Sequence, residues 1–136
     1  MSDKDAIAAA VTEMVDAINR GDFVTATAAF SDAPIIIEDI APFCWHGPDA
    51  VSAWLSAMGA NAARLSAHAV RMRLGEPARI GMDASTAYAL FPGRLSLVTA
   101  DVDLHADGTL TFTLQLSGER WLISALVWSG LEPAAV

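Results

Sequence analysis

The sequence is poor in cysteine and in positive charge. Cys44 is the only cysteine, so no disulfide can form within the chain, and a reducing, cytoplasmic location is expected. Eight Lys and Arg residues face sixteen Asp and Glu residues, which gives a formal net charge of −8. Proteins that bind nucleic acid or anionic membrane surfaces normally have the opposite balance, because they must replace the counterions of phosphates. Neither partner is therefore expected.

The sequence also lacks targeting, membrane-spanning and metal-binding patterns. The N-terminal segment MSDKDAIAAAVTEMV has early acids and no basic region followed by an apolar one, so it does not resemble a signal peptide. The longest uncharged run, residues 50–63, is shorter than the roughly 20 residues that span a bilayer. His46, His68 and His105 have no zinc-ligand spacing, and residues 101–108 fit no calcium loop. No metal and no cofactor are expected.

Apolar residues are abundant instead. They make up 54% of the 136 residues, whereas charged residues make up 18%. A chain of this length forms one domain, residues 1–136, with a core large enough to need no metal or disulfide. The apolar excess has two explanations that are compatible with each other: a large interface between copies of the chain, or an apolar internal cavity.

Helical periodicity dominates the first half of the chain. Ser2 or Asp3 can cap a helix over residues 3–20, and Asp22 can cap a second helix that reaches residue 30. Residues 33–39 are apolar and β-branched and predict a short strand, followed by a turn or short strand over residues 42–47. Pro48 and Asp49 open a third helix, which ends near residue 59 or continues towards residue 64.

Strand patterns dominate the second half. The expected strands cover residues 66–79, with a break at Gly75 and Pro77, then 86–99, then a strand after Asp107-Gly108 in which residues 110, 112, 114 and 116 share one face, and finally 121–128. Turns are expected at residues 81–83 and 117–119, and Asp107-Gly108 predicts a hairpin. Helices followed by strands predict an α+β fold with an antiparallel sheet.

Four stretches carry a resemblance to a known family: NRGDF, IIIED…WHGPDAVSAWL, LTFTLQL and RWLISALVWS. In this order and spacing they resemble the nuclear-transport-factor-2-like (NTF2-like) superfamily, in particular the group related to SnoaL polyketide cyclases and ketosteroid isomerases. The resemblance implies a cone in which three N-terminal helices pack on a curved antiparallel sheet around an apolar pocket. It also implies a homodimer formed through the outer face of the sheet. It does not imply one activity, because many functions share this fold.

Asp39 is the sharpest catalytic candidate. Ketosteroid isomerases have their general base in a similar "ED" at the corresponding place, and a carboxylate at the mouth of an apolar pocket can have a raised pKa. His46 is a second candidate acid–base. The alternatives stay open that Asp39 or Glu38 is a solvated carboxylate at a strand end, and that His46 caps the next helix or faces solvent.

The rest of the isomerase pattern is missing. The resemblance aligns Met14 with the tyrosine that stabilises the oxyanion, and methionine donates no hydrogen bond. The second donor of that family is an acid on a late strand, where Gln115 is the nearest polar residue. We therefore expect no ketosteroid isomerase activity, because the oxyanion contacts usually contribute most to catalysis.

Several aromatic and long apolar residues are expected to line the pocket, although each of them also suits the core. They would favour a small, flat apolar or aromatic ligand. The predicted lining residues are Met14, Phe43, Trp45, Trp54, Met58, Tyr88, Gln115 and Trp128.

Three functions are compatible with these patterns. The leading hypothesis is a homodimeric protein with an apolar small-molecule pocket and no assigned reaction. The second is a cofactor-independent isomerase, cyclase or hydratase with Asp39 as base and His46 or Tyr88 assisting. The third is a protein-association module that uses the face of the sheet. An enzyme requires an inward-facing carboxylate and a second polar group near it, whereas an association module requires neither.

Overall fold

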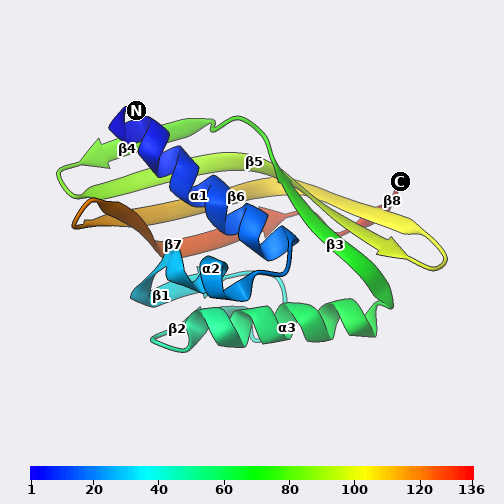
Figure 1. The fold of residues 1–136 in the computed structure, drawn as a ribbon. Helices are drawn as coiled ribbons and strands as arrows, with labels where there is room; N and C mark the ends of the chain where they lie inside the picture. The colour runs from blue at the N-terminus through cyan, green and yellow to red at the C-terminus, as the bar shows by residue number, and fades with distance from the viewer.

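A computed structural model describes residues 1–136, and Figure 1 shows three helices on one face of a curved sheet. The element order matches the expected α+β fold, with helices before long strands. The helices are α1 (Asp3–Asn19), α2 (Phe23–Ala28) and α3 (Ala50–Arg64). The strands are β1 (Phe30–Ile37), β2 (Cys44–His46), β3 (Ala67–Leu74), β4 (Arg79–Asp83), β5 (Thr86–Thr99), β6 (Asp103–Ser117), β7 (Arg120–Gly130) and β8 (Ala134–Ala135).

Local capping signals fix the starts of the first two helices. The Ser2 hydroxyl accepts a hydrogen bond from the backbone N–H of Asp5 at 3.1 Å, and the Asp5 carboxylate accepts one from the Ser2 N–H, which completes a capping box. The Asp22 carboxylate accepts from the Thr25 N–H at 3.1 Å at the start of α2. Both caps were predicted from the sequence and are confirmed.

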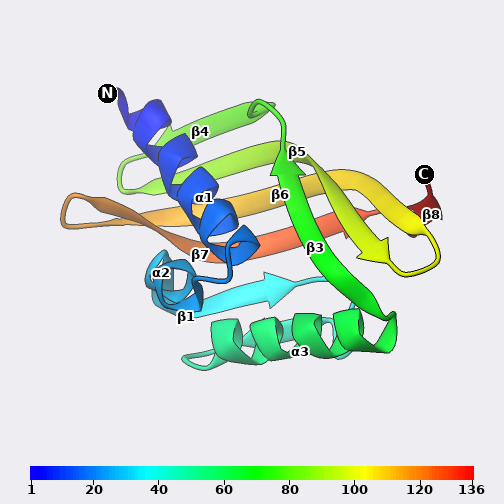
Figure 2. The same ribbon diagram turned by 45° about the vertical axis from the view of Figure 1, so that its right-hand side comes forward.

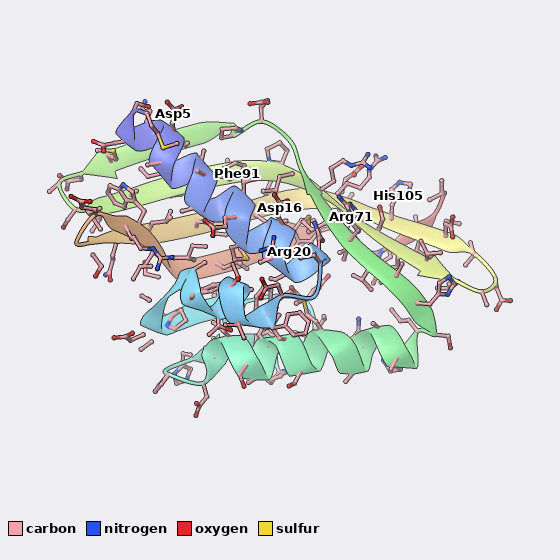
Figure 3. All side chains as sticks on the ribbon, viewed as in Figure 1. Asp5, Asp16, Arg20, Arg71, Phe91 and His105 are labelled. Carbon is pink, nitrogen blue, oxygen red and sulfur yellow. The ribbon has the colours of Figure 1, made fainter.

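The first helix separates charged and apolar residues between its two faces. Asp5, Asp16 and Arg20 are exposed and lie along the helix in Figure 3, while Phe91 belongs to the sheet behind it. The face towards the sheet buries Ile7, Val11, Met14, Val15 and Ala17. This apolar stripe packs α1 on the concave side of the sheet.

The sheet is mostly antiparallel. Its strand order is β2-β1-β7-β6-β5-β3, with β4 paired to β5 and β8 paired to β6. Only β1 and β7 pair in parallel. Figure 2 shows β3 crossing the front of the sheet and descending to the C-terminal end of α3, which follows β1 and β2. β3 therefore packs against both α1 and α3.

Two predicted turns are wrong. Residues 81–83 belong to β4, and the turn follows at residues 84–85. Asp107-Gly108 lies inside β6, and the chain reverses at residues 100–102 instead. Gly108 pairs with Gly93 and Gly130, and a Cβ added there would lie 2.6 Å from the Gly130 Cα atom. This glycine is thus needed for close approach of two strands and not for a turn.

The core fills the space between helices and sheet. Phe91 and Phe112 form an edge-to-face pair with ring centroids 6.0 Å apart, and both are almost completely buried. No polar or charged residue is fully buried. None of the three helices is long and apolar enough to cross a membrane.

Candidate functional site

A cavity of about 270 Å³ lies between α1, α3 and the inner face of the sheet. Twenty residues line it, of which 16 are hydrophobic, and the other four are Asn19, Glu38, Gly59 and Asn61. No lysine, arginine or histidine is among them. The cavity is therefore an apolar space in which the only ionisable group is one carboxyl.

Half of the residues predicted to line a pocket lie at this cavity. Met14, Trp54, Met58 and Trp128 line it. The other four, Phe43, Trp45, Tyr88 and Gln115, do not, and this part of the prediction is corrected. The positions of these four residues in the fold explain why they do not line the cavity. Tyr88 alternates with the buried residues Ala87 and Ala89, and Gln115 follows the buried Leu114, so both side chains lie on the outer face of the sheet.

The remaining two of these residues belong to the segment around β2. Trp45 is buried in the core at 7% exposure, whereas Phe43 is 56% exposed in the bend before β2 and has a φ of 75°. Neither side chain reaches the cavity lining.

The two predicted catalytic residues lie outside the cavity. Asp39 is exposed in the bend that follows β1, and His46 is exposed on the edge strand β2, opposite Ile35. Neither of them lines the cavity. The structure thus corrects the assignment of Asp39 and His46 as the acid–base pair of the pocket.

Glu38 takes the place predicted for Asp39. Side chains of β1 alternate between faces, with Pro34 and Ile36 buried and Ile35 and Ile37 exposed. Glu38 continues the inward series and lines the cavity. Glu38, the carboxylic acid directly before Asp39 in the sequence, therefore occupies the position in the cavity that was predicted for Asp39.

Two contacts and burial determine the chemistry of Glu38. The indole N–H of Trp54 donates a hydrogen bond to Glu38 Oε1 at 3.1 Å. Burial among apolar side chains raises the pKa of Glu38 from 4.5 to about 7, the Trp54 hydrogen bond opposes this rise, and the charge of Asp39 adds to it. Near neutral pH the carboxyl is present in both protonation states.

The second carboxyl oxygen of Glu38 is open. Oε2 has no hydrogen-bond partner in the chain, and every side-chain nitrogen or oxygen that is sealed from solvent has one. Oε2 is consequently accessible, and Glu38 is one of the residues that line the cavity. This geometry allows the carboxyl to take up or release a proton there.

Asn19, at the cavity wall, makes structural hydrogen bonds. Its amide nitrogen donates to the Met72 carbonyl at 2.8 Å, and its amide oxygen accepts from the Met72 N–H at 3.0 Å. Both polar atoms of the side chain are thus used to join the end of α1 to β3. Asn19 therefore holds the wall, and its polar atoms are engaged there.

Asn61 is the remaining polar residue. Its Oδ1 accepts a hydrogen bond from Arg64 Nη2 at 2.7 Å, one turn further along α3, while Nδ2 has no partner in the chain. Met14, which aligns with the isomerase tyrosine, lines the cavity but offers no donor. Glu38 and Asn61 are the two functional groups of the site that the sequence interpretation did not select.

Comparisons with known proteins support the fold over nearly the whole chain. No protein-family model matches the sequence, and no curated protein matches it. Among solved structures, a candidate scytalone dehydratase from Novosphingobium aromaticivorans superposes with a TM-score of 0.80 at 12% identity, covering 98% of this chain and 87% of the other. The hexachlorocyclohexane dehydrochlorinase LinA-type3 from Novosphingobium barchaimii superposes with a TM-score of 0.79 at 12% identity, covering 98% and 89%. A candidate dehydratase of the NTF2-like family from Streptomyces avermitilis gives 0.78 at 14% identity, covering 96% and 97%.

Proposed function

We propose that this chain, which has the NTF2-like fold, binds a small uncharged apolar molecule and transfers a proton to or from it through Glu38. The observation that carries the proposal is an ionisable carboxyl with a pKa of about 7 and a free oxygen in a cavity that is otherwise apolar. The volume of about 270 Å³ suits a ligand somewhat smaller than a drug-sized molecule. No cationic side chain lines the cavity to attract an anionic ligand.

A carboxyl with this pKa is suited to general acid–base catalysis. Proton transfer is most effective when the pKa of the catalytic group lies near the working pH, and burial is a common way to bring a carboxyl there. An ionised Glu38 in apolar surroundings is also poorly solvated, which strengthens it as a base. Trp54 fixes one oxygen and leaves the other for the substrate.

Among reactions that start with proton removal, we favour elimination. The names of two structural neighbours, a dehydratase and a dehydrochlorinase, describe eliminations. Here Glu38 would take a proton from carbon, the C–H electron pair would form the new double bond, and the leaving group would depart with its own electron pair. The cavity has no second carboxyl and no cation, so a leaving group that departs as a stable anion fits better than an enolate, which needs strong oxyanion donors.

A generic substrate tests the base directly. 5-Nitrobenzisoxazole is small, apolar and uncharged, and removal of its ring C–H proton breaks the N–O bond and yields a coloured phenolate without any acid. We expect the purified protein to accelerate this reaction, with a rate that rises with pH around a midpoint of about 7. Glu38→Gln should abolish the acceleration, whereas Asp39→Asn should retain it. Equal activity of wild type and Glu38→Gln would refute the assignment.

We further propose that the outer face of the sheet pairs with a second copy of the chain. From β1 through β7 and β6 to β5, two cross-strand rows on this face contain no charged residue; on β4, Arg79 lies opposite Leu90 at the end of one of them. One consists of Ile35, Ala125, Thr113 and Tyr88, and the other of Ile37, Val127, Thr111 and Leu90. Ile35, Ile37 and Tyr88 are 46%, 42% and 40% exposed. An uncharged, partly apolar patch of this kind can be buried against the same patch of a second copy, which is the arrangement of a two-fold dimer interface.

The oligomeric state tests this second proposal. Sedimentation equilibrium at micromolar concentration should report a dimer, and Ile37→Lys should convert it to a monomer. Val24→Lys is the matched control, because Val24 is 83% exposed on α2, away from this face. A wild-type monomer at these concentrations, or an Ile37→Lys variant that still dimerises, would contradict the proposal.

A further inference from the structure

The orientation of the Asn61 amide is fixed by chemistry. A guanidinium group only donates hydrogen bonds, so the Asn61 atom that meets Arg64 at 2.7 Å must be the oxygen. The amide nitrogen therefore faces away from Arg64, without a partner in the chain. Since every sealed polar side-chain atom has a partner, this nitrogen is accessible. Asn61 lines the cavity, so the cavity wall includes an amide whose N–H groups have no partner in the chain.

The third helix places this donor at some distance from Glu38. Trp54, Met58 and Asn61 are spaced four and three residues apart, which puts them on one face of α3, and all three line the cavity. Trp54 holds Glu38 at one end of this row. At 1.5 Å per residue, Asn61 lies about 10 Å further along the helix axis. The two polar groups thus mark different ends of an apolar wall.

We infer that Asn61 is the second polar contact of the ligand, and that the ligand class is an elongated apolar molecule with a hydrogen-bond acceptor, such as a carbonyl oxygen, at the end away from Glu38. The inference rests on the proposed function, because it assigns the substrate of the same cavity. The acceptor receives a hydrogen bond from Asn61 Nδ2, and the apolar body lies along Met58.

Arg64 has a positioning role in this arrangement. It is exposed and does not line the cavity, but its hydrogen bond to Oδ1 prevents the amide from turning round and presenting its oxygen to the ligand. The positive charge also polarises the amide and strengthens Nδ2 as a donor. Ligand selectivity for acceptors over donors at this end consequently depends on a residue outside the cavity.

A pair of nearly isosteric probes tests the inference. 2-Acetylnaphthalene carries a carbonyl where 2-isopropenylnaphthalene carries a CH₂ group, and both are apolar bicyclic molecules. Equilibrium dialysis gives the dissociation constant of each probe, and the ratio of alkene to ketone constants measures the preference for the carbonyl. We expect Asn61→Leu and Asn61→Asp to lower this ratio by about fivefold, the value of one hydrogen bond. Neither variant can donate from this position, and the two differ in polarity, so a folding defect in one leaves the other as a test.

The positioning role of Arg64 is tested by the same ratio of dissociation constants in two Arg64 variants. Arg64→Met should lower the ratio while leaving the dissociation constant of 2-isopropenylnaphthalene unchanged, and Arg64→Lys, which still donates to Oδ1, should restore the ratio. If both probes bind and the ratio is the same in wild type and in both Asn61 variants, the role of Asn61 is refuted while the cavity stands. If neither probe binds to the wild type, both the inference and the proposed binding function are overturned.

Discussion

Replacement of Glu38 by glutamine is expected to stabilise the protein at alkaline pH and to have little effect at acidic pH. Glutamine has nearly the same shape, and its carbonyl oxygen can still accept the hydrogen bond from Trp54. What the substitution removes is the ability to ionise. The difference between the two proteins therefore isolates the contribution of one charge in the apolar cavity.

The sign of this stability difference follows from the direction in which folding changes the pKa of Glu38. The pKa of Glu38 rises from 4.5 in the unfolded chain to about 7 in the folded protein, so the folded state holds the proton more tightly. The stabilising effect of this proton is fully present below about pH 4.5 and is lost as the pH rises through about 7. Each tenfold change in proton affinity corresponds to about 1.36 kcal/mol, so the full loss amounts to roughly 3 kcal/mol.

Urea unfolding at several pH values measures this difference. At pH 4 the unfolding free energies of wild type and Glu38→Gln should agree within about 0.5 kcal/mol, and at pH 8 the variant should be more stable by roughly 3 kcal/mol. Other titrating groups contribute equally to both proteins, so their effects cancel in the difference. Asp39→Asn is the control: it removes an adjacent but exposed carboxyl, and its difference from wild type should stay well below that of Glu38→Gln at both pH values.

The reasoning would be refuted by a difference between wild type and Glu38→Gln that does not change with pH. Such a result would mean that water reaches the carboxyl freely in the folded protein. A difference of the opposite sign would mean that a cation, absent from the cavity lining, pairs with the carboxylate.

Three other substitutions test a hydrogen-bonded contact, a close approach of strands and a surface ion pair. Asn19→Leu leaves the N–H and C=O of Met72 without partners and should lower the unfolding free energy by about 2 kcal/mol in urea titrations. A loss below about 0.5 kcal/mol would contradict a stabilising role of these two hydrogen bonds. Gly108→Ala brings a methyl group against Gly130 and Trp128 and should lower the melting temperature markedly. Gly81→Ala is the control and should not lower it, because no atom lies within 4 Å of the new Cβ. Equal effects of the two substitutions would disprove the close approach of strands as the role of Gly108. Arg94→Gln breaks the ion pair between Arg94 and Asp107, whose two side chains are 52% and 56% exposed, respectively. The urea midpoint of unfolding should therefore shift slightly at low salt and not at all at high salt. A large shift that persists at high salt would be incompatible with a screened surface pair.

Local signals in the sequence were sufficient to predict the helical half of the fold. The caps at Ser2 and Asp22 act through hydrogen bonds three residues away, so nothing distant is needed to identify them. The Asp107-Gly108 pair was misleading because glycine serves two purposes. It permits a turn, and it permits close approach of strands, and only the positions of Gly130 and Trp128 decide between them.

The position of the carboxyl in the site could not be obtained from the sequence. Ala33, Pro34 and three consecutive isoleucines precede Glu38 and Asp39, so residues 33–37 contain no polar residue that reveals which side chains point inward. A change of phase by one residue moves every side chain to the other face. The resemblance to ketosteroid isomerases favoured Asp39, whereas the burial of Pro34 and Ile36 puts Glu38 inside.

Asn61 was within reach of sequence reasoning. Its spacing from Trp54 and Met58 places it on the apolar face of the third helix, provided that the helix continues beyond Gly59. The sequence predicts an end of that helix anywhere between residues 59 and 64, and a helix that stops near residue 59 does not include Asn61. The helix does continue, to Arg64.

The two hydrogen bonds between Asn19 and Met72 also occupy part of an open edge of the sheet. The third strand is the last one in the path of the sheet, so one of its sides has no neighbouring strand. An open strand side is a template for an extended segment of another molecule, and such pairing leads to aggregates and fibrils. The Asn19 side chain occupies the donor and the acceptor of Met72, two residues before that strand ends at Leu74. A single amide thereby interrupts the row of groups that a foreign strand would have to pair with.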